Sequence, residues 1–134
     1  MTDTTNKLKN LANDIMEKAY SPYSNFSVGA SLITEKDNIY SGCNVENVSY
    51  GLAICAERNA IVQAVAKEGP DVKIKEIVIT NKNAEGNSIP CSPCGACRQF
   101  IAEFATVQTA IHYQGANGDV TLTMEELLPD SFRF

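Results

Sequence analysis

Several features that mark particular classes of protein are missing from this chain of 134 residues. It has no opening segment of positive and then apolar residues that would direct secretion, and no apolar run near the ~18 residues of a membrane span. Lysine and arginine are not clustered, and the formal net charge is −5. Proteins that bind nucleic acid usually need a basic face to neutralise phosphates, so a long polyanionic substrate is not expected. We expect a cytoplasmic protein.

Histidine is also scarce, and the five cysteines are an odd number. The only histidine, His112, falls inside a predicted strand, where it is more typical of a core or surface residue than of a metal ligand. In a reducing compartment the cysteines are more typical of metal ligands and buried thiols than of disulfides. The 44% hydrophobic and 20% charged residues match a globular protein, and the length suits a single domain, residues 1–134.

Hydrophobic periodicity predicts alternating helices and strands. Helices are expected at residues 3–20, 54–68, 94–104 and 123–128, and strands at 26–34, 39–43, 74–80, 109–113 and 120–122. Thr123 and Glu126 fit a capping box at the start of the last helix. Strands separated by helices imply parallel pairing with right-handed crossovers, while the first two strands form a hairpin. The sequence therefore predicts an α/β fold with a mixed five-stranded sheet flanked by helices.

Two short segments bring together cysteines and a glutamate. Cys55 precedes Glu57 by two residues at one predicted helix start, and Cys94 and Cys97 form a C-x-x-C motif at another. Helix N-termini stabilise negative charge and so favour the thiolates that bind metal. Zinc with three protein ligands keeps a fourth position open for water, which is the arrangement of a catalytic site. Glu57 would then be free to move protons.

Two other interpretations of the cysteines stay open. A closed structural zinc site needs a fourth ligand, for which Cys43, Cys91 and His112 are candidates. A redox role for the C-x-x-C motif is the second, although thioredoxin-type motifs follow an early strand and need no partner motif.

Two arginines directly follow the ligand segments. Three thiolates would leave a zinc site with net negative charge, which discourages ionisation of bound water. We expect Arg58, and with less support Arg98, to hydrogen-bond to the sulfurs and restore the Lewis acidity of the metal.

A Cys or His, any residue, then Glu, with a later P-C-x-x-C, is the motif of the zinc nucleobase deaminases. Further motifs are Y-S-N-F-S-V-G-A from Tyr23, G-C-N-V-E-N from Gly42, C-A-E-R-N-A from Cys55, P-C-G-A-C-R-Q from Pro93 and L-L-P from Leu127. In their order and spacing, over essentially the whole chain from the first helix onward, they resemble the small cytidine deaminases that act on free nucleosides. Deaminases of polynucleotides usually have histidine at the position of Cys55, which also points to a small substrate. The resemblance implies a three-layer cytidine-deaminase-like fold.

The resemblance also implies a reaction. Cytidine and 2′-deoxycytidine would be deaminated hydrolytically to uridine and 2′-deoxyuridine with release of ammonia, as in pyrimidine salvage. Cys55, Cys94 and Cys97 would hold Zn²⁺, zinc hydroxide would attack C4, and Glu57 would shuttle protons to N3 and to the leaving ammonia.

Substrate-binding roles follow from the same resemblance. Asn44 and Glu46 are two residues apart, so in extended backbone their side chains would point to one side, where the family binds the ribose 3′-hydroxyl. Phe26 resembles an aromatic residue that packs on the substrate. Backbone groups around Ala56 would pair with the base edge.

The end of the chain resembles the terminal segment of the family. There the residue matching Phe132 reaches into a neighbouring subunit's site and stacks on the base, and the residue matching Tyr50 lies near subunit contacts. The resemblance therefore implies a homotetramer with shared active sites.

Three alternative functions remain open at this point. One is deamination of a modified cytosine nucleoside, against which the Asn44 and Glu46 pair argues. Another is a zinc-stapled binding domain without catalysis, in which Glu57→Gln has no rate to change. The third is nucleic-acid editing, which predicts salt-sensitive binding to single strands and is disfavoured by the net charge of −5.

Overall fold

The computed structural model describes residues 2–133, which form one mixed five-stranded sheet with the strand order β2-β1-β3-β4-β5. The strands are β1 (Ser27–Thr34), β2 (Ile39–Cys43), β3 (Ile74–Lys82), β4 (Ala105–Gly115) and β5 (Gly118–Thr123). The α-helices are α1 (Asp3–Met16), α2 (Ala56–Glu68), α3 (Gly95–Phe104) and α4 (Met124–Leu127), and a short 3-10 helix, η1 (Tyr50–Leu52), precedes α2. The predicted fold class and element order are confirmed.

The pairing of the strands differs from the prediction at one place. β1 pairs antiparallel with both β2 and β3, whereas β3 and β4 are parallel and β4 and β5 antiparallel. We predicted parallel pairing wherever a helix separates two strands, and this is wrong across α2. The first hairpin leaves one edge of β1 open, and β3 occupies that edge. β2 and β3 therefore run parallel but are not neighbours.

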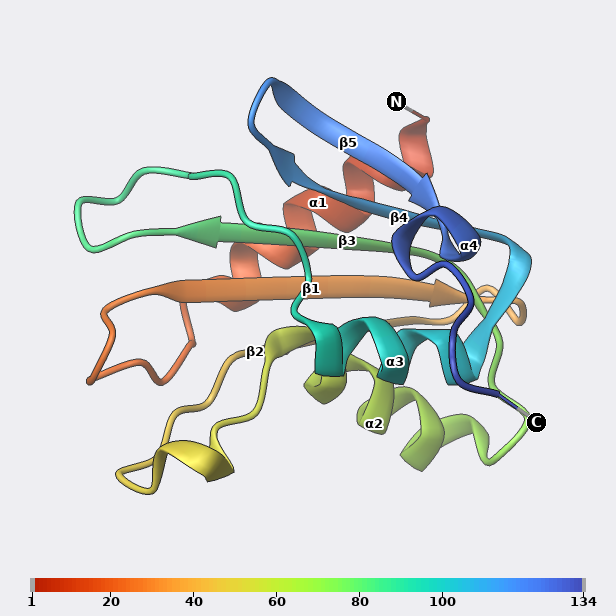
Figure 1. Cartoon of the computed structure of the whole chain (residues 1–134), viewed down its shortest axis with the longest axis horizontal. Helices are drawn as coiled ribbons and strands as arrows, with labels where there is room; N and C mark the ends of the chain where they lie inside the picture. The colour runs from red at the N-terminus through yellow and green to blue at the C-terminus, as the bar shows by residue number, and fades with distance from the viewer. Residues whose placement is uncertain (1, 134) are drawn as a thin grey trace.

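The sheet is the middle of three layers. A Cβ atom on Gly29 would lie 2.0 Å from the carbonyl oxygen of Ala12, so this glycine lets α1 approach one face. A Cβ atom on Gly42 would lie 2.4 Å from the amide nitrogen of Ala60, so this glycine lets α2 approach the opposite face. In Figure 1, α1 crosses behind the strands, on the face opposite to α2 and α3.

The core lies between the sheet and α2. Its buried residues include Leu32 of β1, Ile77 of β3 and Ile111 of β4, packed with Ala56, Ala60, Ile61 and Ala64 of α2. The small side chains of the alanines, spaced four residues apart, let α2 pack close to the strands, as the apolar sequence of the helix predicts. Because α2 begins directly after Cys55, the core fixes the position of a predicted metal ligand.

Element boundaries depart from the prediction by a few residues. α1 ends at Met16 rather than at residue 20, and β4 covers residues 105–115 rather than 109–113. The capping box at α4 is confirmed: the Thr123 hydroxyl accepts from the Glu126 amide at 3.2 Å, and the Glu126 carboxylate accepts from the Thr123 amide at 2.9 Å. None of the helices within residues 2–133 has both the length and the apolarity needed to cross a lipid bilayer.

Candidate metal centre

Three cysteine sulfurs from two helix N-termini converge on one point. Cys55 is the N-cap residue of α2 and Cys94 the N-cap residue of α3, while Cys97 lies in the first turn of α3. The Sγ atoms of Cys55 and Cys94 are 3.9 Å apart, and all three sulfurs lie within 4.8 Å of one another. Zn–S bonds of about 2.3 Å in a tetrahedral site place sulfurs roughly 3.8 Å apart, so these residues fit a zinc ion.

The surroundings of the sulfurs favour negative charge. The backbone amide of Cys97 donates to the Cys94 sulfur at 3.4 Å, and the Arg58 Nη2 atom donates to the Cys55 sulfur at 3.5 Å. A hydrogen bond from Cys97 is the main cause that lowers the pKa of the Cys55 thiol to about 5; burial opposes it, while Arg58 and Cys94 add to it. The same hydrogen bond, with burial, raises the pKa of Cys97.

Arg58 hydrogen-bonds to a ligand sulfur, as predicted, whereas the hydrogen bonds of the Arg98 side chain go to backbone carbonyls. Arg58 also donates to the carbonyl oxygen of Ala53 at 3.4 Å, and its Nε atom is buried without a hydrogen-bond partner among residues 2–133. A half-buried cation such as Arg58 is stabilised when the neighbouring thiols ionise, as they do on binding metal. The guanidinium of Arg98 instead donates to the carbonyl oxygens of Pro93 and Leu127.

Glu57 is almost fully buried, with 4% of its surface exposed, in the first turn of α2. Burial is the main cause that raises the pKa of its carboxyl group, and the negative charge of Cys55 acts in the same direction. A carboxyl group that takes up a proton more readily than usual, two residues from a metal ligand, is suited to proton transfer.

The candidates for a fourth protein ligand lie outside the cluster. Within residues 2–133, the group of potential ligand atoms contains only the three sulfurs of Cys55, Cys94 and Cys97. His112 is used elsewhere: its ring nitrogens pair with Thr121 at 2.7 Å and with Glu76 at 2.8 Å. The three-ligand arrangement therefore leaves one position of a tetrahedral metal without a protein donor.

Cys43 and Cys91 are both half-buried free thiols. Cys91 follows the loop after β3, where its amide donates to the carbonyl oxygen of Gln114 at 2.9 Å. Burial is the first cause that raises the pKa of each of these two thiols. Neither thiol joins the cluster, which weighs against a closed four-cysteine site.

The predicted sugar-binding segment lies beside the first ligand segment. Val45, between Asn44 and Glu46, forms a two-way backbone bridge with Ile54, with N···O distances of 3.0 and 2.9 Å. The Asn59 side chain of α2 also donates to the carbonyl oxygen of Cys43 at 2.7 Å. These bonds hold residues 43–46 next to the start of α2.

Asn44 and Glu46 both point toward residues 23–28, the loop before β1 and the start of that strand, as their spacing predicts. The Asn44 amide group accepts from the Val28 amide and donates to the Phe26 carbonyl, both at 2.9 Å. The Glu46 carboxylate accepts from the amides of Tyr23 and Ser24 at 3.0 and 3.2 Å. Each side chain thus anchors the loop that carries Phe26.

Ser24 is a residue that the sequence interpretation left without a role. Its hydroxyl donates to the Glu46 carboxylate at 2.5 Å and accepts from the Phe26 amide at 3.0 Å. The hydrogen bond from Ser24 is the main cause that lowers the pKa of Glu46. A serine between Tyr23 and Asn25, whose φ is 56°, is a local turn signal that could have identified this contact.

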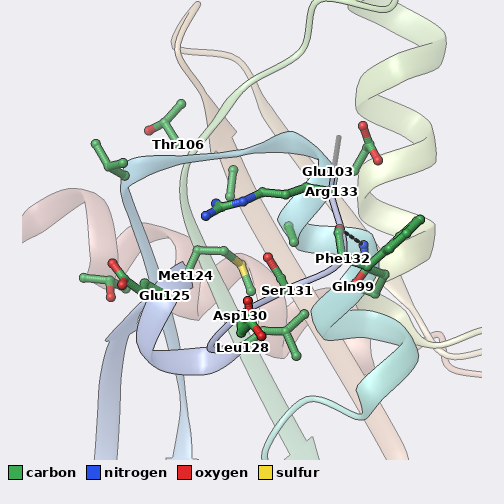
Figure 2. A pocket seen from close by; sticks show the side chains of 14 residues that line it. Gln99, Glu103, Thr106, Met124, Glu125, Leu128, Asp130, Ser131, Phe132 and Arg133 are labelled. Carbon is green, nitrogen blue, oxygen red and sulfur yellow. Dashed lines mark hydrogen bonds between the residues drawn. The ribbon is translucent and has the colours of Figure 1, made fainter.

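Two cavities lie near the ends of the site elements. One of about 250 Å³ is lined by Tyr23, Ser24, Glu46, Asn47, Tyr50 and Ala53. A larger one of about 630 Å³ lies between the outer part of α3 and the terminal segment, with Gln99, Glu103 and Arg133 among its walls (Figure 2). The larger cavity contains neither Glu57 nor a cysteine, so it is not the metal centre.

The remaining predicted residues differ in how far they are buried. Ala56 is fully buried at the start of α2, and Phe26 is half-buried just before β1. Phe132 is 71% exposed, and its carbonyl oxygen accepts from the Gln99 side chain at 3.0 Å. Tyr50 is 75% exposed, and its ring contacts that of Tyr23 edge-on, with centroids 5.8 Å apart.

Comparisons with known proteins agree with this geometry. Residues 2–113 match the family model described as the cytidine and deoxycytidylate deaminase zinc-binding region. A cytidine deaminase from Sporosarcina psychrophila is 44% identical over 117 residues, which are 87% of this chain and 82% of that protein. The crystal structure of cytidine deaminase from Burkholderia pseudomallei superposes with a TM-score of 0.82 at 39% identity, covering 98% of this chain and all of the other. The corresponding structure from Mycobacterium tuberculosis gives a TM-score of 0.82 at 31% identity over the full length of both chains.

Proposed function

The chain belongs to the family of zinc-dependent cytidine and deoxycytidylate deaminases, and from this premise we propose that it hydrolyses cytidine and 2′-deoxycytidine to uridine and 2′-deoxyuridine, releasing ammonia. The observation that carries the proposal is the convergence of three cysteine sulfurs within 4.8 Å beside a buried glutamate. The need of these thiols to stay reduced favours a reducing compartment such as the cytoplasm.

We assign the proton transfers to Glu57. Zinc held by Cys55, Cys94 and Cys97 would supply a Lewis acid that lowers the pKa of water toward neutrality. Glu57 accepts a proton from the attacking water and delivers it to N3 of the cytosine ring. It then carries the proton of the new C4 hydroxyl group to the amino group, so that the C4–N bond breaks, the C4 carbonyl forms and ammonia leaves. Its burial supports this role, because a buried carboxyl group exchanges between its neutral and charged forms more readily near neutral pH.

The sugar is assigned to the segment around Asn44 and Glu46. Both side chains reach the loop of Phe26 and retain acceptor capacity for a hydroxyl group after the bonds described above. The cavity beside Glu46 has no lysine or arginine in its walls. A phosphate on the sugar would bring further negative charge toward the Glu46 carboxylate with no cation in these walls, which favours a nucleoside over a nucleotide.

A substrate panel tests this function. Zinc-replete protein is incubated with cytidine, deoxycytidine, their 5′-monophosphates, a cytosine nucleoside modified on the ring, and cytosine-containing single-stranded DNA, and ammonia release is measured. We expect conversion of the two nucleosides, with kcat/KM at least tenfold lower for the monophosphates. Preferred conversion of the modified nucleoside or of the DNA would contradict the assignment.

We further propose a homotetramer with shared sites. Residues 45–54 expose large apolar side chains next to the metal centre: Val48 is 77%, Tyr50 75% and Leu52 65% exposed. A second copy of the chain would cover this surface, since contiguous apolar patches rarely remain in water. Phe132 is also exposed, and we assign it to a neighbouring subunit's site because the family resemblance of the terminal segment implies that role.

The mass in solution tests the tetramer. Sedimentation equilibrium should give about four times the 14.5 kDa of one chain. Leu52→Asp should lower the mass, because it buries an unpaired charge in the interface, whereas Lys75→Asp at an exposed position of β3 should not. A wild-type monomer that remains fully active would overturn the proposal.

A further inference from the structure

Arg98 connects two parts of the molecule that are far apart in sequence. Its Nε atom donates to the carbonyl oxygen of Pro93 at 2.8 Å, and its Nη1 atom donates to the carbonyl oxygen of Leu127 at 2.7 Å. Pro93 is the residue directly before the ligand Cys94, and Leu127 is the last residue of α4. One guanidinium group thus joins the ligand loop to the C-terminal helix.

Both acceptors are carbonyl groups that need a partner. Pro93 and Leu127 are buried residues, and a buried carbonyl group that has no hydrogen bond destabilises the folded chain. The Leu127 carbonyl also lies at the C-terminal end of a helix, where carbonyls lack partners within the helix and a cation is favourable. The two bonds from Arg98 therefore stabilise the loop and the helix end at the same time.

The contact lies next to the metal centre without touching it. The backbone amide of Arg98 donates to the Cys94 carbonyl oxygen at 2.9 Å, so the backbone on both sides of the Cys94 sulfur is bonded to the same residue. The neighbouring Gln99 side chain holds the carbonyl oxygen of Phe132, a contact drawn in Figure 2. Consecutive residues of α3 thus attach the terminal segment to the helix that carries two ligands.

We propose that Arg98 is a positioning residue that fixes the orientation of the Cys94 ligand by fastening its loop to the end of α4. This rests on the zinc site of the proposed function but not on the reaction. Movement of α4 or loss of the guanidinium would displace the Pro93 carbonyl and with it the Cys94 sulfur. Arg58, by contrast, acts on the sulfur of Cys55 directly.

The geometry requires an arginine. The guanidinium is planar and presents donors in a fixed fork, so one group reaches two carbonyls in different directions. Lysine would keep the positive charge but has one nitrogen on a flexible stem. Arg98→Lys should therefore recover the function only in part, whereas Arg98→Met keeps the apolar stem and removes every donor.

The test measures the metal rather than the reaction. Wild type, Arg98→Met, Arg98→Lys and Arg133→Met are loaded with Zn²⁺, and the rate of its transfer to a chromophoric chelator is recorded. We expect release to be about 10- to 100-fold faster for Arg98→Met, in the range typical of residues that support metal ligands, and intermediate for Arg98→Lys. Arg133→Met removes the same charge from an exposed terminal residue and should release zinc at the wild-type rate.

A spectrum of the Co²⁺-substituted proteins separates positioning from general stability. The ligand-field bands of Co²⁺ depend on the arrangement of the thiolates, so they should shift for Arg98→Met and stay unchanged for Arg133→Met. Unchanged bands and an unchanged zinc release rate in Arg98→Met would overturn the proposal. If Arg98→Met does not fold, the same two outcomes are judged on Arg98→Lys. Both readouts can be obtained even if the protein deaminates no cytidine.

Discussion

The Arg58 side chain is the clearest example of a single residue that serves the metal ligands. It follows the C-A-E motif, reaches the Cys55 sulfur at 3.5 Å, and leaves its Nε atom buried without a partner in the described part of the chain. The sequence predicted this contact because Arg58 directly follows the ligand segment and three thiolates need a compensating cation. Its cause is electrostatic, since the cation offsets the charge of the thiolates.

Arg58→Ala should weaken zinc binding by about 10- to 100-fold, because the Cys55 thiolate loses its cationic partner. Competition with a chelator of known affinity measures the effect. Lys67→Ala, which removes an equal charge from the last turn of the same helix, serves as the control. Equal zinc affinity in Arg58→Ala and wild type would show that the arginine is not needed by the sulfurs.

Residues differ in how far their roles could be predicted from sequence. The convergence of the three cysteines could be predicted because a metal dictates the type and spacing of its ligands, and the role of Glu57 stays a prediction from the same motif. The partners of Ser24 and Arg98 were not, because their hydrogen bonds go to a distant carboxylate and to backbone carbonyls whose positions depend on the folded chain. A motif records the residue type at a position, whereas the direction of its side chain is decided by packing.

Helix α2 positions Cys55 and Glu57, and strand β2 determines how closely this helix packs against the sheet. Gly42 of β2 leaves room for the α2 backbone: an added Cβ atom would lie 2.4 Å from the Ala60 nitrogen and 2.8 Å from the Ala56 oxygen. Contacts this short require the helix to move. Because Cys55 and Glu57 lie at the start of that helix, the site must move with it.

Gly42→Ala should therefore reduce both stability and activity. Overpacking of this kind costs about 1–3 kcal/mol of unfolding free energy. Denaturant unfolding and kcat/KM for cytidine provide the two measurements. Gly51→Ala is the matched control, since a Cβ atom there meets nothing within 4 Å. If both variants behave alike, close packing of α2 does not position the site.

The end of α2 is tied to the β1–β2 hairpin by Glu68. Its Oε2 atom accepts from Thr34 at 2.8 Å, Asn38 at 2.9 Å and Tyr40 at 3.0 Å. Burial by itself raises the pKa of this carboxyl group, but the hydrogen bonds from Asn38, Thr34 and Tyr40 lower it below its ordinary value. A carboxyl group with a lowered folded-state pKa stabilises the fold above the ordinary glutamate pKa of about 4.3.

Glu68→Gln should consequently lower the free energy of unfolding at neutral pH, and this loss should become smaller at acid pH. The contribution of the carboxylate is fully present at pH 7 and disappears as the pH falls through the lowered folded-state pKa. Unfolding free energies of wild type and Glu68→Gln between pH 7 and pH 3 measure this difference. Glu103→Gln, on the exposed side of α3, controls for the change in net charge. A difference that grows toward acid pH would contradict the expected sign.

The presence of the helices and strands could be predicted from hydrophobic periodicity, whereas their boundaries and the pairing of the strands could not. The helix at residues 3–16 was expected to reach residue 20, but after Met16 the chain turns so that Tyr20 can bridge to Val45. Residues 105–108 directly follow the predicted helix at 94–104 and were assigned to the connection after it, although they form the start of the strand beside β3. In both places, pairing with a segment far away in the sequence determines where the element ends or begins. A local sequence pattern carries little information about such pairing.

At the scale of the whole molecule, the three layers explain why distant segments form one site. α2 and α3 begin at the same end of the sheet, and their N-termini bring together ligands 39 positions apart in the sequence (Figure 1). The family resemblance predicted this architecture, and the structural matches with TM-scores of 0.82 bear it out. Assembly into a tetramer remains a proposal, because it depends on a second copy of the chain.

The central claim is that three cysteines hold one zinc ion and that Glu57 moves the protons of deamination. The most direct measurement is uridine formation from cytidine by wild type and Glu57→Gln after both are brought to equal zinc content. We predict conversion by wild type and a rate about 10²- to 10⁴-fold lower for Glu57→Gln, because general acid–base catalysis contributes an effect of that size. Equal rates at equal zinc content, or no conversion by zinc-replete wild type, would contradict the claim.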